Sequence, residues 1–188
     1  HRMGNMSPTT LMPLTYPAHA TLQEKLRLGS ARVALARLMG RVETLAPVEF
    51  AGPDCKPIDV RVAVRECLRR DAPTLANLSE AAVEGAHGSV LSAFARDYLG
   101  SPAEGCLSVL TCWRERELSM MACLPWLRVG VREAGWADDL WRAGARDFVF
   151  AEPSGGRVFA VIRDDHDNEV AVVGAEAVVL IRRAAARG

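Results

Sequence analysis

A row of arginines is the clearest chemical pattern in the sequence. Arg61, Arg65 and Arg69 recur at every fourth residue, and Arg70 follows directly. On a helix this spacing places the first three on one face, and planar guanidinium groups with paired donors suit phosphate oxygens. The row predicts contact with a polyanion. The residues assigned to nucleic-acid binding are Arg37, Arg41, Arg61, Arg65, Arg69 and Arg70.

The alternative interpretation of the row is an ordinary solvated helix face. Glu66 lies among the arginines and lowers the local potential. The sequence has no glycine-rich phosphate loop, zinc-finger spacing or aromatic RNA-binding signature to accompany the row. The spacing alone therefore leaves both interpretations open.

Cysteine chemistry is a second candidate. The thiol of Cys106 is predicted near a helix N-terminus, where the helix dipole would lower its pKa. A thiol nucleophile also needs a base such as His19, His87 or His166. The chain has an odd number of cysteines and no CxxC pair, so reduced thiols packed as small apolar groups are the simpler interpretation. The five are Cys55, Cys67, Cys106, Cys112 and Cys123.

Two further groups of residues are candidates for binding. The run from Asp164 to Asn168 has three carboxylates and His166, which suit a divalent cation, but Asp and Asn also favour hairpin turns for backbone reasons. We therefore expect a polar turn there, with no metal and no cofactor. Four tryptophans lie within 29 residues and are expected either to pack in the core or to wall a pocket. They are Trp113, Trp126, Trp136 and Trp141.

The composition places these residues in a globular chain. It has 188 residues, of which 49% are hydrophobic, and a formal net charge of zero. Residues 1–70 hold 11 Lys/Arg against 6 Asp/Glu, a balance of +5, and residues 71–188 hold 12 against 17, a balance of −5. The basic half is therefore expected to carry any polyanion contact.

Helix signals dominate the first three quarters of the chain. A capping box at Thr21–Glu24 opens a helix that Gly29 weakens, which leaves room for a break there, and Asp59 is the N-cap of a helix over roughly 60–70. Pro73 and Thr74 are expected to open a third helix, and residues 89–99 form another that Gly100 ends. Ser101-Pro102-Ala103-Glu104 predicts a helix running to Pro125, and a short helix is expected at 136–143.

The last quarter of the chain has the pattern of strands. Apolar, β-branched runs at 148–151, 158–162, 170–173 and 178–181 are separated by turn residues. The fold class expected is α+β, with an N-terminal helical bundle-like portion packed on a C-terminal antiparallel β meander of three to four strands. Residues 89–117 also resemble a helix-turn-helix in outline, but Pro102-Ala103-Glu104 offers no base donors, which favours a plain helical hairpin.

The two ends of the chain are expected to be irregular. Residues 1–20 read as an extended arm whose first residues derive from a tag, residues 21–188 as one domain, and the arginine-rich end as frayed. No secretory signal or membrane-spanning run is found, so a cytoplasmic protein is expected.

These observations predict a non-enzymatic regulatory or interaction protein whose basic N-terminal helices contact a polyanion, with nucleic acid, including DNA, as the expected partner. One alternative is a small cytosolic enzyme, either a cysteine-dependent hydrolase or a transferase, with no catalytic residue assigned. The other is a module that binds a protein partner and no nucleic acid. The sequence assigns no oligomeric state.

Overall fold

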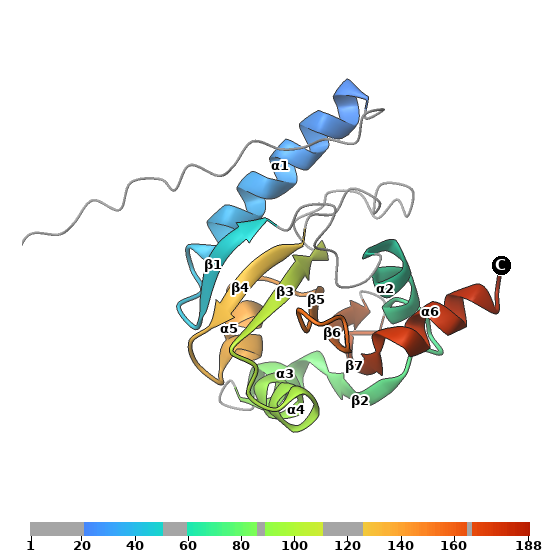
Figure 1. Ribbon diagram of the computed structural model, residues 1–188. Coiled ribbons are helices and arrows are strands. Elements are labelled where there is room, and N and C mark those ends of the chain that lie inside the picture. The colour runs from blue at the N-terminus through green and yellow to red at the C-terminus, as the bar shows by residue number, and fades with distance from the viewer. Residues whose placement is uncertain (1–20, 51–59, 86–88, 111–125, 165–166) are drawn as a thin grey trace, which may run out of the picture.

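A computed structural model describes residues 21–50, 60–85, 89–110, 126–164 and 167–188. It shows a mixed helix-and-sheet fold with six helices and seven strands in those residues (Figure 1). The helices are α1 (Leu22–Met39), α2 (Val60–Cys67), α3 (Glu80–Gly85), α4 (Val90–Leu99), α5 (Trp136–Arg142) and α6 (Ala177–Ala185). The strands are β1 (Leu45–Phe50), β2 (Thr74–Ser79), β3 (Glu104–Val109), β4 (Leu127–Val131), β5 (Phe148–Ala151), β6 (Arg157–Asp164) and β7 (Glu169–Glu176).

All seven strands join one antiparallel sheet in the order β1-β4-β3-β5-β6-β7-β2. The expected meander is present as the neighbouring strands β5, β6 and β7, and β6 and β7 form a hairpin in which Asp164 pairs with Glu169. The expectation of three to four strands was wrong, because β1, β2, β3 and β4 extend the sheet on both sides. No helix in the described residues is long and apolar enough to cross a membrane.

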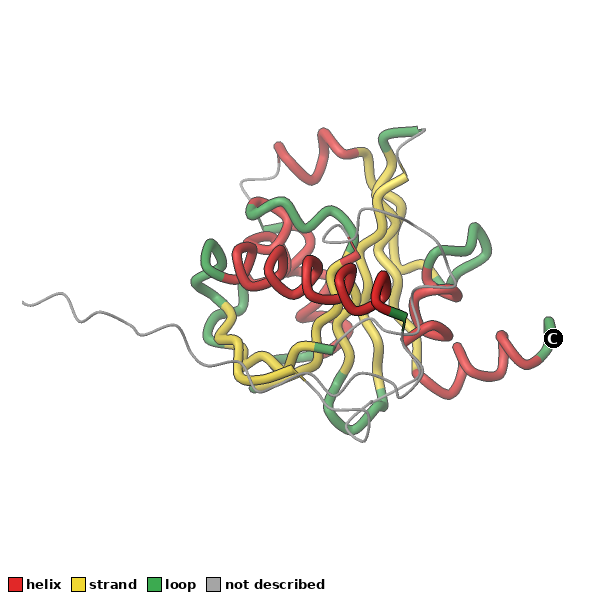
Figure 2. Tube along the Cα trace, turned by 90° about the horizontal axis from the view of Figure 1, so that it is seen from above, coloured by secondary structure: helices red, strands yellow, loops and turns green. Residues whose placement is uncertain are grey.

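The sheet is apolar on both faces, and helices cover each of them (Figure 2). Along β5, Phe148 and Phe150 point to one face and Val149 and Ala151 to the other, as the alternation of a strand requires. We call the side of Phe148 and Phe150 the first face and the side of Val149 and Ala151 the second face. Helices α1, α3, α4 and α5 pack on the first face, and α2 and α6 pack on the second. The N-terminal helices therefore do not form a bundle.

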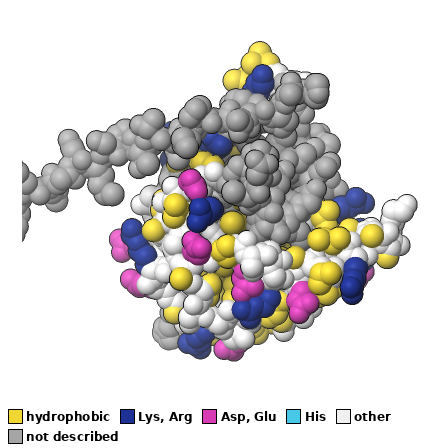
Figure 3. Space-filling model, viewed as in Figure 1, with side chains coloured by type: hydrophobic (Ala, Val, Ile, Leu, Met, Phe, Trp, Pro, Cys, Tyr) yellow, Lys and Arg dark blue, Asp and Glu magenta, His cyan; other side chains and the backbone are white. Residues whose placement is uncertain are grey.

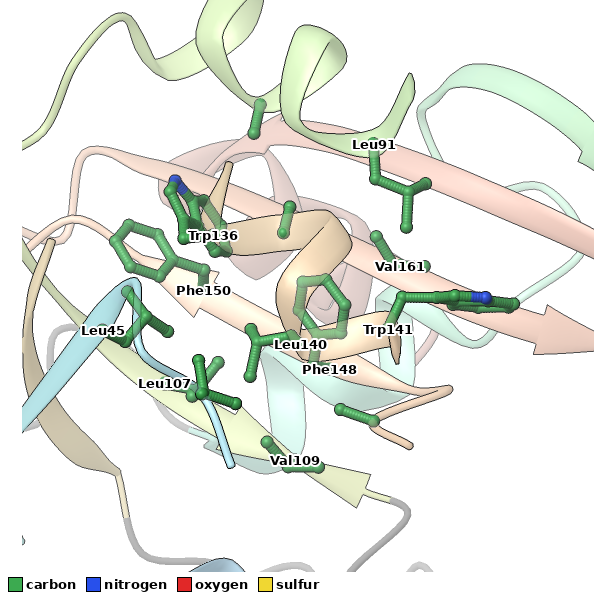
Figure 4. Packing of buried hydrophobic residues seen from close by; sticks show 14 of the residues in the cluster. Leu45, Leu91, Leu107, Val109, Trp136, Leu140, Trp141, Phe148, Phe150 and Val161 are labelled. Atoms are coloured by element: carbon green, nitrogen blue, oxygen red, sulfur yellow. The ribbon is translucent and has the colours of Figure 1, made fainter. Parts of the chain in front are cut away.

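Trp136 of α5 is central to the core on the first face (Figure 4). Its ring lies 4.5 Å from that of Phe150, 6.0 Å from that of Phe159 and 6.2 Å from that of Phe148, measured between centroids. All four side chains are at most 3% exposed. Edge-on and tilted pairs of this kind add to the stabilisation that burial of their area supplies.

Strand β3 replaces the start of the helix predicted from Ser101-Pro102-Ala103-Glu104 to Pro125; residues 111–125 of that span lie outside the described residues. The capping signal was overridden because β3 lies between β4 and β5, where both faces of the strand are buried and the sequence needs no polar alternation. The packing around β3 is so close that Gly105 has no room for a side chain, because a Cβ there would lie 2.0 Å from Cζ of Phe150. The second helix of the helix-turn-helix outline therefore does not begin where it was expected.

Other boundaries also differ from expectation. Thr74 opens strand β2, not a helix, and the helix begins only at Glu80. The apolar run at 178–181 lies in helix α6, not in a fourth meander strand, and α1 continues through Gly29 without a break. The helices expected near 60–70, 89–99 and 136–143 are confirmed as α2, α4 and α5, and Gly100 ends α4 with a φ of 75°.

Helix α4 is held at both ends by charged side chains from other elements. At its N-terminus the buried Asp138 carboxylate accepts hydrogen bonds from the backbone N–H groups of Leu91 at 3.1 Å and Ser92 at 2.7 Å, while the Ser92 hydroxyl accepts from the Asp138 N–H at 3.1 Å. At its C-terminus Arg157 donates to the carbonyls of Tyr98 and Leu99 at 2.7 and 3.1 Å. These groups satisfy backbone atoms that a helix end leaves open.

We predict that Asp138→Ala lowers the free energy of unfolding by about 3 kcal/mol, because two buried N–H groups lose charged acceptors worth about 1.5 kcal/mol each. Urea denaturation measures the change. Asp97→Ala is the matched control, since Asp97 is an exposed acid on α4 whose ion pair with the exposed Arg96 spans 3.9 Å. Equal losses in the two variants would contradict the capping role.

The Glu152–Arg157 pair predicts a pH dependence. Hydrogen bonds from Arg157 at 2.6 and 3.0 Å outweigh desolvation and hold the pKa of the Glu152 carboxyl below its ordinary value of 4.5. Because the folded pKa is lowered, the stabilisation is complete above about pH 4.5 and is lost as the pH falls through the folded value.

Between about pH 6 and about pH 3, the unfolding free energy should therefore fall less for Glu152→Gln than for the unmodified chain. Denaturant titrations at several pH values measure the slope. Glu133→Gln, which changes an exposed acid before α5, should keep the original slope. A Glu152→Gln curve parallel to that of the unmodified chain would argue against the effect.

Candidate functional site

Helix α2 packs one side on the sheet and turns the other to solvent. Ala63, Val64 and Cys67 are at most 2% exposed and lie in the core of the second face. Arg65 is exposed, as the four-residue spacing predicts for a row on the opposite side. The local amphipathic pattern thus positions the arginines through the burial of their apolar neighbours.

Glu66 is the exception on α2, because this charged side chain is only 1% exposed. Its carboxylate accepts a hydrogen bond and forms an ion pair with Arg187, and it lies 3.7 Å from Nε of Arg183. Both arginines come from the end of the chain, on or just after α6. A buried carboxylate needs such partners, since removal from water is costly for an unpaired charge.

Asp71 completes this contact at the surface. It lies 2.6 Å from Arg187 and 3.0 Å from Arg183, and the Arg183 guanidinium also donates to its backbone carbonyl. Desolvation raises the pKa of the Asp71 carboxyl, but the charges of Arg187 and Arg183 outweigh it, so this pKa lies below its ordinary value. We call Glu66, Asp71, Arg183 and Arg187 the carboxylate clasp.

The clasp places the chain's arginine-rich end beside the predicted row. Helices α2 and α6 lie side by side (Figure 1). Residues 60–72 and 177–188 together contain seven arginines and two acids, a balance of +5. The arginines are Arg61, Arg65, Arg69, Arg70, Arg182, Arg183 and Arg187. We call this region the α2–α6 surface.

The α2–α6 surface leaves several arginines accessible. The exposed arginines are Arg65, Arg69, Arg70 and Arg182. Of these, Arg69 forms an ion pair in which its Nε lies 3.6 Å from Oδ1 of Asp71. The side chain of Arg61 lies outside the described residues. Figure 3 shows Lys or Arg side chains at this end of the molecule beside apolar ones. Exposed apolar residues on α6 are Val178, Val179 and Ile181.

The other two predicted arginines lie elsewhere. Arg37 of α1 and Arg41 just after it are exposed. Helix α1 packs on the first face of the sheet and α2 on the second. The structure therefore does not gather all six predicted residues on one surface, and it adds Arg182, Arg183 and Arg187, from the end of the chain that the sequence predicts to be frayed.

The described cysteines do not have the environment of activated thiols. Cys67 and Cys106 are both buried in the core of the second face. Burial, with the charge of Glu66, raises the pKa of the Cys67 thiol to about 12, so this thiol stays protonated at neutral pH. Cys106 lies on β3, so the dipole expected from a helix N-terminus is absent. Cys55, Cys112, Cys123 and the histidines proposed as bases lie outside the described residues.

The tryptophans that the structure describes lie in the core, and the described residues of the acidic run lie in or beside a hairpin turn. Trp126 packs on the second face, and Trp136 and Trp141 pack on the first, so these three do not wall one pocket; Trp113 lies outside the described residues. In the hairpin of β6 and β7, Asn168 has a φ of 51°, a turn conformation that asparagine tolerates. Within the described part of the chain no group of three or more His, Cys, Asp or Glu is placed to hold a metal ion, and residues 165–166 of the acidic turn lie outside it.

Comparison with known proteins gives no relative from which a site could be transferred: no protein-family model, no curated protein and no solved structure matches the chain.

We predict that Arg183→Ala with Arg187→Ala lowers the free energy of unfolding by about 3 kcal/mol, because a buried carboxylate is left without a partner. Thermal and urea denaturation measure the loss. Adding Glu66→Gln should recover part of it, since no unpaired charge is then buried. Arg182→Ala with Arg132→Ala removes two exposed arginines and should change stability by less than about 0.5 kcal/mol. A similar loss in both double variants would show that the clasp adds nothing.

Proposed function

We propose that the chain is a non-enzymatic, cytoplasmic interaction protein that binds a polyanion, namely nucleic acid, through the α2–α6 surface. The observation that supports it is the balance of +5 over 25 residues from two distant segments that lie against each other. A concentrated positive patch attracts the phosphate backbone irrespective of sequence. The acids within the patch, Glu66 and Asp71, are already engaged by Arg183 and Arg187.

The type of cation also supports the proposal. All seven positive residues of the α2–α6 surface are arginines, and none is lysine. Arginine presents paired donors in a fixed plane, which match two phosphate oxygens at once. Arg65, Arg69 and Arg70 are the accessible members on and after α2, and Arg182 is the accessible member on α6. We assign phosphate contact to these four.

We predict that the protein binds a fluorescent DNA duplex or single-stranded RNA of about 20 nucleotides in low salt, measured by anisotropy. The affinity should fall steeply as salt increases, because binding releases counterions. Arg65→Ala, Arg69→Ala and Arg70→Ala together should weaken binding and reduce the salt slope by about 3, since each arginine is expected to neutralise about one phosphate.

The matched control removes the same charge from the first face. Arg37→Ala, Arg41→Ala and Arg96→Ala change three exposed arginines on or beside α1 and α4 and should leave most of the affinity intact. Equal weakening by the two triple variants would show that only net charge matters and would contradict the assigned surface. Absence of binding at low salt would contradict the function itself. Binding of an acidic polypeptide such as polyglutamate in place of both nucleic acids would favour the protein-partner alternative.

A further inference from the structure

Helix α1 has two apolar sides, and among the described residues only one of them packs in the core. Ala31, Leu35, Leu38 and Met39 are each 4% exposed, and the last three pack in the core on the first face of the sheet. Leu22, Leu26 and Val33 are 74%, 63% and 51% exposed. At 3.6 residues per turn the last three lie within about 40° of one another, on the opposite side of the helix. The N-terminal end of α1 extends beyond the sheet (Figure 1).

The outer side has the spacing of a coiled-coil seam. Leu22, Leu26, Gly29, Val33 and Ala36 follow one another at intervals of four, three, four and three residues. This is the a/d repeat that packs one helix against another. A Cβ built on Gly29 would meet no atom within 4 Å, so the seam is open at its centre. We call these five residues the outer seam.

The residues that flank the outer seam carry only positive charge. At the e and g positions of the repeat stand Gln23, Lys25, Ser30, Arg32, Arg37 and Met39, the last of which packs in the core. The Arg32 guanidinium lies 4.3 Å from the ring centre of Phe50. Charges at these positions select the partner of a coiled coil. A second copy of α1 would place basic residues against basic residues.

We infer that the outer seam binds an acidic amphipathic helix of another protein, with aliphatic residues at its a and d positions and Asp or Glu at e and g. Charge complementarity supports this occupant, and the 4-3 spacing fits a helix. An anionic bilayer fits less well, because binding to lipid scales with inserted apolar area. The seam offers three large aliphatic side chains, no aromatic one, and glycine at its centre.

The test uses the whole chain and a labelled synthetic peptide of about three heptads, with leucine at a and d and glutamate at e and g. Fluorescence anisotropy should show saturable binding. A peptide that differs only by lysine at e and g should bind at least about tenfold more weakly, because its charges repel those of α1. Leu22→Glu with Leu26→Glu should abolish binding of the acidic peptide.

Two matched variants separate the seam from general effects. Val178→Glu with Ile181→Glu places the same charges on exposed apolar residues of α6 and should leave peptide binding unchanged. Gly29→Leu should tighten binding by at least about fivefold more than Gly29→Ala, because both variants favour the helix but only leucine fills the seam. Circular dichroism checks that each variant remains folded.

Several results would overturn the inference. Equal affinity for both peptides, or affinity for neither, contradicts a seam selected by charge. Binding to vesicles of phosphatidylcholine and phosphatidylserine that Leu22→Glu with Leu26→Glu removes, without peptide binding, assigns α1 to a membrane surface. Sedimentation that shows a dimer dissociated by the same substitutions assigns the seam to a second copy. None of these outcomes depends on nucleic-acid binding by the α2–α6 surface.

Discussion

The buried carboxylate of Glu66 is the constraint on which the α2–α6 surface depends. At 1% exposure it requires cations, and Arg183 and Arg187 supply them from more than 110 residues away in sequence. These ion pairs help to hold α6 against α2, so the helix that carries Arg182 lies beside the helix that carries Arg65. A hydrophobic residue in place of Glu66 could pack as well, but it would not select an arginine-bearing helix. The clasp thus couples folding of the chain's end to the charge that the proposed function uses.

The same dependence on distant partners explains which parts of the fold the sequence predicts. Elements with a complete local pattern were predicted correctly: α2 from its N-cap and spacing, α4 with Gly100 at its end, and the strands β5, β6 and β7 from their β-branched runs. Strand β3 was not, because a local capping signal, Ser101-Pro102-Ala103-Glu104, precedes a segment whose conformation is decided by β4 and β5 on either side.

Strand β2, at the edge of the sheet, and the last helix, α6, were also not predicted from the sequence, for two different reasons. Among the described strands β2 pairs only with β7, and its sequence, Thr74 to Ser79, lacks the dense apolar run of a central strand. Helix α6, in contrast, has a local sequence that resembles a strand. Its Val178–Ile181 run is β-branched enough to resemble a strand, but the helix gains its stability from Leu180 in the core and from the clasp, which no local pattern reveals.

The candidate surface was predictable in part. The spacing of Arg61, Arg65 and Arg69 predicts one exposed face, and the exposure of Arg65 and Arg69 agrees with it. Arg183 and Arg187 are also four residues apart, a spacing that places two side chains on one side of a helix. That spacing is the sequence signal for the second set of arginines, which was not predicted. Whether a basic segment joins a surface is decided by which face of the sheet its helix covers. Helices α1 and α2 cover opposite faces, and which face each helix covers depends on the topology of the whole sheet.

Arginine side-chain resonances offer the most direct test of the central claim, that the α2–α6 surface contacts nucleic acid. Nuclear magnetic resonance of the Nε–Hε groups, assigned by single Arg→Lys variants, can follow each guanidinium while a short DNA duplex is added. If this surface contacts nucleic acid, the signals of Arg65, Arg69, Arg70 and Arg182 should shift together and saturably, while those of Arg37, Arg41 and Arg96 stay in place. Shifts confined to Arg37 and Arg41, or small shifts spread evenly over all exposed arginines, would contradict it.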